Sequence, residues 1–266
     1  MDNAKQLYID LYKTNFSEDG MTVIENKHLS KIDICTDVDV QEVVFKLREL
    51  IFKRYSDGLS IKAEEFDSFC YLNVFVFFGE DVSTLIEYLE SISLDNVTCI
   101  DESSLKREDG EVTFLSIDYI DQEDLKEFEL LMKAQGLDSE KYLLGQSAYE
   151  RGAGDYHQIV VFVVEGIALG ALSEFGRRSI KKFFDQFGEY QRPSLIKFNP
   201  DIAIDYVSER SGFNKQDLRV TRVSPTEDKN IEIKVTSRYK DFLLTYEKKS
   251  KSITHYEETS KSQTLI

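Results

Sequence analysis

Three residues toward the C-terminal end have the types and spacing of a hydrolytic metal site. Asp217 is followed by Glu232 and then, two positions further, by Lys234. Two carboxylates can hold a divalent cation, and a neighbouring lysine can help to activate an attacking water. If these residues lie on adjacent antiparallel strands, their parity puts all three side chains on the same outward face. They are the catalytic candidates that the sequence offers.

The Asp217 and Glu232-Ile233-Lys234 pattern resembles that of restriction-type nucleases, and the resemblance implies metal-dependent cleavage of nucleic acid. A Glu-x-Lys is also common on exposed strands, so a nuclease is kept as the third hypothesis. His28, His157 and His255 fall in separate segments without an Asp or Cys at a recognisable spacing. Neither C-x-x-C nor H-x-x-x-H occurs. We therefore expect no cofactor and no bound metal, and a non-enzymatic role is favoured.

The longest apolar run, residues 156–172, is expected to form a helix that starts at a capping box. Its apolar residues cover every side of a helical projection, which favours a buried central helix. Gly166 and Gly170 would also let a second backbone approach, so the helix could pair with a copy of itself. Membrane insertion is a further alternative. It is disfavoured because Glu165 puts a carboxylate in the middle of a run shorter than about 18 residues.

Charge separates the first half of the chain from the rest. The formal net charge is −16, and residues 1–150 contain 33 Asp and Glu against 14 Lys and Arg. Such a surface repels nucleic acid phosphate and attracts a basic protein. We therefore expect the N-terminal half to bind a basic protein partner and not nucleic acid. The residues chosen as the acidic binding surface are Asp118, Asp121, Glu123, Asp124 and Glu127.

Hydrophobic periodicity predicts an α+β fold with a mixed β-sheet and a small C-terminal helix plus antiparallel β-meander. Segment 69–78 is apolar on both faces, which predicts a central strand. Helices are expected at 1–15, 39–55, 82–93, 121–135, 139–150, 175–187 and 200–211. Strands are expected at 21–24, 31–35, 97–100, 112–120, 218–223, 231–237, 242–247 and 253–256.

Four regions are predicted from these elements. They are an acidic α+β domain at 1–150, an apolar and basic helical connector at 151–192, a helix with a β-meander at 193–258, and a flexible tail at 259–266. The first residues lack the apolar stretch of a signal peptide, and the three cysteines are widely spaced. We therefore expect a cytoplasmic protein with reduced, buried thiols. Richness in Lys, Ile and Tyr without Trp suggests a bacterial source.

The leading hypothesis is a non-enzymatic protein-binding module of the immunity, inhibitor or anti-defence type. Its acidic N-terminal domain would neutralise a basic partner by charge complementarity. The alternative is a membrane-acting effector that inserts or oligomerises through the 156–172 helix.

Overall fold

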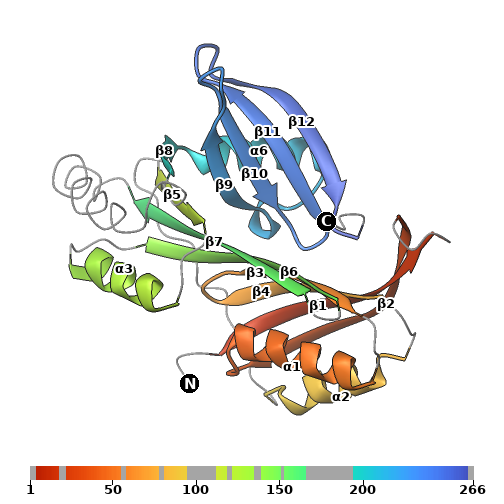
Figure 1. Cartoon of the computed structure of the whole chain (residues 1–266). Coiled ribbons are helices and arrows are strands. Elements are labelled where there is room, and N and C mark those ends of the chain that lie inside the picture. The colour runs from red at the N-terminus through yellow and green to blue at the C-terminus, as the bar shows by residue number, and fades with distance from the viewer. Residues whose placement is uncertain are drawn as a thin grey trace. The chain divides into compact units, whose positions relative to one another are not determined.

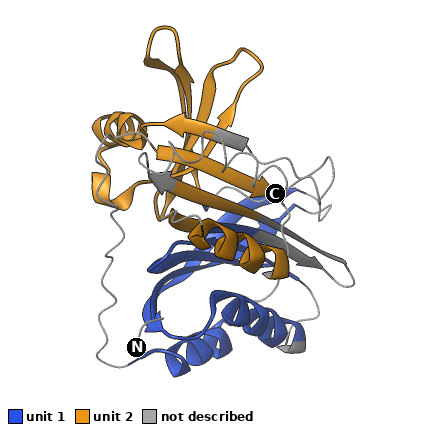
Figure 2. Ribbon diagram, turned by 90° about the vertical axis from the view of Figure 1, so that its left-hand side faces the viewer, with its two compact units in different colours: residues 1–103, 143–157, 261–266 blue, residues 104–142, 158–260 orange. Residues whose placement is uncertain are grey.

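The computed structural model describes residues 4–17, 22–54, 58–77, 81–94, 112–118, 122–134, 139–150, 153–165 and 194–262. The chain divides into two compact units, coloured separately in Figure 2. Residues 1–103, 143–157 and 261–266 form unit 1, and residues 104–142 and 158–260 form unit 2. The units do not follow the predicted regions, because the chain passes from one to the other within two strands, Ser139–Glu150 and Ala153–Glu165. The predicted α+β class with a mixed sheet is confirmed.

Unit 1 is a mixed sheet whose strands follow the order β2-β1-β4-β3-β6. Strand β1 pairs in parallel with β4, and the other pairings are antiparallel. The pairing of β6 with β3 uses residues 143–149 of β6. The elements are β1 (Lys5–Phe16), β2 (Val23–Thr36), α1 (Val40–Arg54), β3 (Leu59–Glu65), β4 (Phe69–Val76), α2 (Ser83–Ser91) and β6 (Ser139–Glu150).

One face of this sheet carries the core of unit 1. Alternate residues of β1 and β4 pack against the apolar sides of α1 and α2, and Figure 1 shows the two helices side by side along the strands. Because side chains alternate across a strand, the residues between them lie on the opposite face. Strand β4 lies between β1 and β3 and is buried throughout, so the predicted central strand is confirmed. The core includes Leu7, Ile9, Leu11, Val43, Leu47, Ile51, Leu72, Val74, Leu85 and Leu89.

Two predicted helices in this unit are strands instead. Residues 1–15 contain β1, whose core residues Leu7, Ile9 and Leu11 recur with the period of a strand. Residues 139–150 form β6, because the edge of β3 offers them a partner that no local pattern reveals. Strand β3 was not predicted, and the two short strands expected at 21–24 and 31–35 form the single strand β2. The strand expected at 97–100 lies outside the described residues.

Unit 2 contains two antiparallel groups of strands. Strand β5 pairs with β7 on one side and β8 on the other, and the meander follows the order β12-β11-β10-β9. Helix α6 packs against β9 and β10. The elements are β5 (Val112–Asp118), α3 (Gln122–Ala134), β7 (Ala153–Glu165), β8 (Ser194–Phe198), α6 (Pro200–Ser211), the 3₁₀ turn η3 (Lys215–Asp217), β9 (Arg219–Pro225), β10 (Ile231–Thr236), β11 (Lys240–Glu247) and β12 (Ser252–Ser260).

The expected apolar helix at 156–172 is wrong for its first ten residues, which belong to β7. Residues 159–165 pair with β5, from Ile159 opposite Asp118 to Glu165 opposite Val112. A short apolar run that is buried on every side fits an inner strand as well as a helix, and its many Val and Ile residues favour the strand.

The remainder of that run, including Gly166 and Gly170, lies outside the described residues, as does the helix expected at 175–187. Glu165 is the last residue of β7 and not the middle of a helix. Within the described part of the chain, none of the helices has both the length and the apolar character needed to cross a bilayer.

The C-terminal helix and the β-meander predicted from the sequence are present in the structure. The Asn199 side chain accepts a hydrogen bond from the Asp201 N–H at 2.9 Å, and Gly212 ends α6 with φ 78°. The flexible tail predicted from 259 begins too early, because Thr259 and Ser260 belong to β12 and Lys261 is only 4% exposed.

The cysteines divide between two states. Cys70 is a free, fully buried thiol whose pKa is raised by burial and then by the nearby Glu65 carboxylate. Cys35 is disulfide-bonded, so the expectation of a reduced thiol is wrong there. Cys99 lies outside the described residues.

Gly212 gives a direct test of the end of α6. Its positive φ strains any side chain, although a Cβ would meet nothing within 4 Å. We expect Gly212→Ala to lower the free energy of unfolding by about 1 kcal/mol, and Gly212→Asn to lower it by less, because Asn tolerates this conformation. Urea denaturation measures both, with Glu209→Ala on exposed α6 surface as the control. Equal stability of the Ala variant and the wild type would contradict the assigned backbone.

Candidate functional site

The three catalytic candidates do not form one site. Asp217 lies in η3, before β9 begins, whereas Glu232 and Lys234 lie on β10. Arg219, the first residue of β9, pairs with Thr236, so Asp217 lies beyond the end of β10 and more than about 13 Å along the strand from Glu232. In the described ranges, no group of three His, Cys, Asp or Glu side chains is placed to hold a metal.

Lys234 is engaged in an ion pair within the sheet. Its Nζ lies 2.9 Å from Oδ2 of Asp241 on β11, and the other carboxylate oxygen of Asp241 accepts a hydrogen bond from the Thr236 hydroxyl at 2.6 Å. This arrangement joins β10 to β11 at one end of their ladder. It does not present a lysine beside two carboxylates, as water activation by a metal would require.

The predicted acidic surface is partly assembled on α3. Glu123 and Glu127 are exposed and Asp124 is half-buried on this helix. Asp118 ends β5, and Asp121 lies outside the described residues. Leu130 of α3 is also 68% exposed. The sequence therefore identified a negatively charged helix, and the structure shows that Leu130 is exposed on the same helix.

A more strongly marked surface lies on the outer side of α1 and was missed in the sequence. Phe45 is 63% exposed, although Val43, Val44 and Leu47 around it are buried in the core. A shallow apolar depression is lined by Phe45, Arg48, Glu49 and Phe52. The signal that could have found it is an aromatic residue placed off the apolar stripe of a predicted helix. We call these four lining residues the α1 surface.

Exposed carboxylates lie on α1, on α2 and on the segment before α1. Glu42 raises the pKa of Tyr88 on α2, after the larger effect of burial, so the two helices bring their charges close together. The Leu94 N–H donates to the Cys35 carbonyl at 2.8 Å, which fixes the end of α2 beside the start of α1. The exposed acidic residues of these segments are Asp37, Asp39, Glu42, Glu87 and Glu90.

A histidine and a carboxylate meet on the other face of the unit 1 sheet. His28 Nε2 lies 3.2 Å from Asp10 Oδ1, and the imidazole also packs against the Tyr12 ring with centroids 5.3 Å apart. Asp10 is buried, whereas the His28 side chain is 48% exposed. A buried carboxylate that orients an accessible imidazole can support proton transfer, but it does not define a reaction by itself. Sequence spacing missed the pair because β-sheet pairing joins the two residues.

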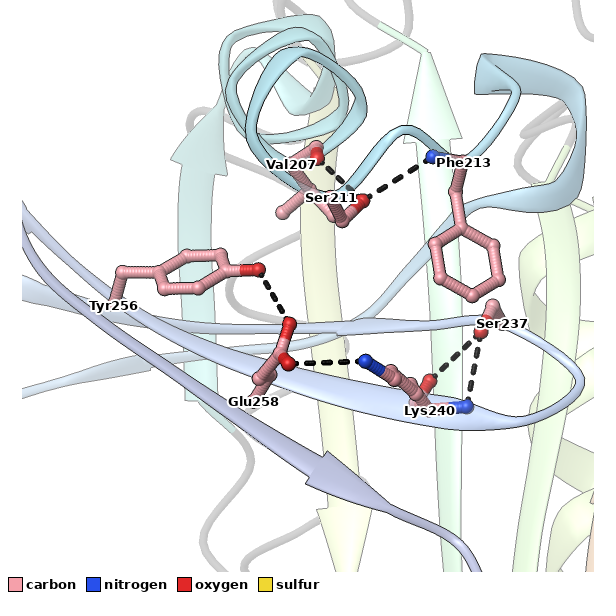
Figure 3. A network of polar contacts seen from close by, with 7 residues as sticks. All are labelled: Val207, Ser211, Phe213, Ser237, Lys240, Tyr256 and Glu258. Atoms are coloured by element: carbon pink, nitrogen blue, oxygen red, sulfur yellow. Dashed lines mark hydrogen bonds and ion pairs between the residues drawn. The ribbon is translucent and has the colours of Figure 1, made fainter.

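A polar network in unit 2 ties β12 to β11, as Figure 3 shows. The Tyr256 hydroxyl donates to Glu258 at 3.0 Å, and Lys240 Nζ donates to the other oxygen of that carboxylate at 2.9 Å. The Arg210 guanidinium of α6 lies 4.7 Å from the centroid of the Tyr256 ring. Hydrogen bonds from Lys240 and then Tyr256 lower the pKa of Glu258. Each group pairs with a neighbour in the same unit, so the network is a support for the meander.

The pKa of Tyr256 makes this network testable. Burial, followed by the hydrogen bond to Glu258, raises that pKa from 10.0 to about 12. Between these two pH values the unfolded chain loses the phenol proton first, so the folded state loses stability as pH rises. We expect the wild type to lose stability relative to Tyr256→Phe over this range. Urea denaturation at pH 9, 10 and 11 measures the difference, and a constant difference would contradict the assigned environment.

No protein-family model, no curated protein and no solved structure matches this chain.

Proposed function

We propose that this protein is a non-enzymatic protein-binding module that docks a basic partner on the α1 surface. The observation that carries the proposal is the 63% exposure of Phe45 beside an apolar depression. Helix α1 has a buried apolar side that already satisfies its packing in unit 1. An aromatic residue on the outer side is therefore not needed for the core.

The apolar part of the surface would supply most of the affinity. Burying a phenylalanine side chain is worth about 1.5–3 kcal/mol, and aromatic residues often dominate the energetics of interfaces. Arg48 stacks near the Phe52 ring, with its guanidinium carbon 5.7 Å from the centroid. This contact holds the depression next to Phe45 in place.

The exposed charges would select the partner. Exposed carboxylates on the segments around α1 and α2 attract a basic surface and raise the association rate, mainly at low salt. Lys46 Nζ is paired with Glu49 at 2.8 Å, which offsets the positive charge of that lysine next to the depression. Exposed carboxylates together with an apolar depression fit a basic protein that presents an apolar side chain.

An immunity, inhibitor or anti-defence role in a bacterium remains our proposal for this binding activity. Such a role requires only tight, charge-guided binding, which the α1 surface supports. A cytoplasmic location also remains a proposal, and the disulfide at Cys35 argues against it, because disulfides are rare in cytosolic proteins. Thiol alkylation of rapidly quenched cells, followed by mass spectrometry of the Cys35 peptide, distinguishes the reduced from the disulfide-bonded form.

A peptide library tests the proposed surface without a known partner. Random 12-residue peptides displayed on phage are selected on the wild-type protein, and the enriched peptides are synthesised for titration. We expect enrichment of Lys or Arg around an aromatic or aliphatic residue. We expect Phe45→Ala to weaken binding about tenfold. Because Phe45 is exposed, the variant should keep its stability within about 0.5 kcal/mol.

The matched control is Leu130→Ala, which removes another large exposed apolar side chain, 68% exposed on α3. It should leave binding unchanged. Binding should also weaken as salt rises from 50 to 200 mM, because the exposed charges are screened. Selection of acidic peptides, or equal binding by wild type and Phe45→Ala, would overturn the proposal.

A further inference from the structure

Four aromatic rings gather at one end of the unit 1 sheet, on the face that α1 and α2 do not cover. Tyr8 comes from β1, Phe69 and Tyr71 from β4, and Phe66 from the turn before β4. The Tyr71 centroid lies 5.7 Å from that of Tyr8, 5.1 Å from that of Phe69 and 5.8 Å from that of Phe66. Such clusters present ring faces that attract cations.

A carboxylate completes this cluster. Glu64 of β3 is the direct partner of Tyr71 in the antiparallel ladder, so their side chains lie on the same face of the sheet. The Glu64 side chain is only 13% exposed. A largely desolvated carboxylate beside aromatic rings attracts a cation strongly, because it has lost much of the water that would otherwise solvate its charge.

The cation is supplied by the C-terminal segment of the same chain. The Lys261 ammonium donates to Glu64 Oε2 and lies 4.8 Å from the centroid of the Tyr71 ring. Lys261 is 4% exposed, and lysine is almost never buried unless it is paired. The next residue is also held, because the Asn26 side-chain amide donates to the Ser262 carbonyl. Two consecutive residues are therefore bound to unit 1 at separate points.

We propose that Glu64 and the surrounding aromatic rings form a binding site for a lysine side chain, and that Lys261 is its intramolecular and exchangeable occupant. The contacts with Glu64 and Tyr71 recognise an alkylammonium group and its charge, which any accessible lysine can offer. Lys261 follows β12, whose ladder ends at Ser260. A lysine from a partner protein can therefore replace Lys261 without breaking that ladder.

This site is distinct from the α1 surface and does not depend on the proposed function. Core residues of β4, such as Leu72, face α1 and α2, whereas Tyr71 lies on the opposite face of the strand. The C-terminal segment then has a regulatory role, because bound Lys261 excludes an external lysine from the site. A tethered occupant competes with an effective concentration on the order of millimolar.

A full-length variant and a peptide supplied in trans test the proposal. The probe is a fluorescent octapeptide with the sequence of residues 259–266, Thr-Ser-Lys-Ser-Gln-Thr-Leu-Ile. We expect Lys261→Met, which keeps an apolar stem but removes the ammonium, to bind this octapeptide at least about tenfold more tightly than the wild type. The double variant Lys261→Met with Glu64→Gln should lose that gain.

A control peptide has Met in place of its lysine and should not bind. Equal anisotropy titrations for the wild type and Lys261→Met, or tight binding of the control peptide, would overturn the proposal. These variants do not change Phe45, so their outcome is independent of the test of the α1 surface.

A second measurement uses only the wild type, so it holds even if the variants fail to fold. Reductive methylation followed by peptide mass spectrometry compares Lys261 with the exposed Lys251. Lys261 should be modified slowly, and millimolar unlabelled octapeptide should speed its modification about threefold or more while leaving Lys251 unchanged. An unchanged rate at Lys261 would show that the segment is a fixed anchor, and the proposal would fail.

Discussion

The parallel pairing of β1 with β4 is the constraint on which the rest of unit 1 depends. It places Tyr8 opposite Tyr71 and Asp10 opposite Asn73, and it leaves Leu7, Ile9 and Leu11 in the core. A shift of the register by one residue would exchange the two faces of the strand and bury the polar set under α1 and α2. Packing against α1 and α2 therefore determines which residues of β1 and β4 face the helices. The residues between them must then lie on the opposite face.

That opposite face is unusual because it is both buried and polar. Asp10, Thr14, Ser60 and Asn73 have exposures of 3% or less and belong to strands of the sheet. Buried polar groups must be paired to be tolerated, and the Thr14 hydroxyl accordingly donates to Asn26 at 2.8 Å. Stability alone would favour apolar side chains at these positions.

The sequence predicted well those elements whose signals are local. Helices α1, α2 and α6, the central strand β4 and the C-terminal meander all have caps or periodic patterns that lie within one segment. It failed at β1, β6 and β7, where the choice between helix and strand depends on a partner elsewhere in the chain. In residues 160–163, which are all buried, the sequence lacks the alternation that would have distinguished the two structures.

The functional sites were harder to predict than the fold, for the same reason. Asp10 and His28 are 18 residues apart, and Glu64 and Lys261 are 197 residues apart, so neither pair follows a motif spacing. Asp217, Glu232 and Lys234 did follow one, but the chain turns at η3 before β9 starts and separates them. Overall charge leads to a prediction of a basic partner without requiring any contact to be known, and that partner stays a prediction.

The two proposed surfaces select positive charge by different physics. Around Phe45 the carboxylates are exposed, so their attraction acts over about a Debye length and weakens with salt. Glu64 is desolvated beside Tyr71, so its attraction for an ammonium is short-ranged and is screened much less. The two surfaces lie on opposite sides of one sheet, so a single short segment of a partner cannot occupy both. With Lys261 bound at Glu64, the chain would still attract a basic partner over a long range to the α1 surface. The same contact would keep an external lysine out of the Glu64 site.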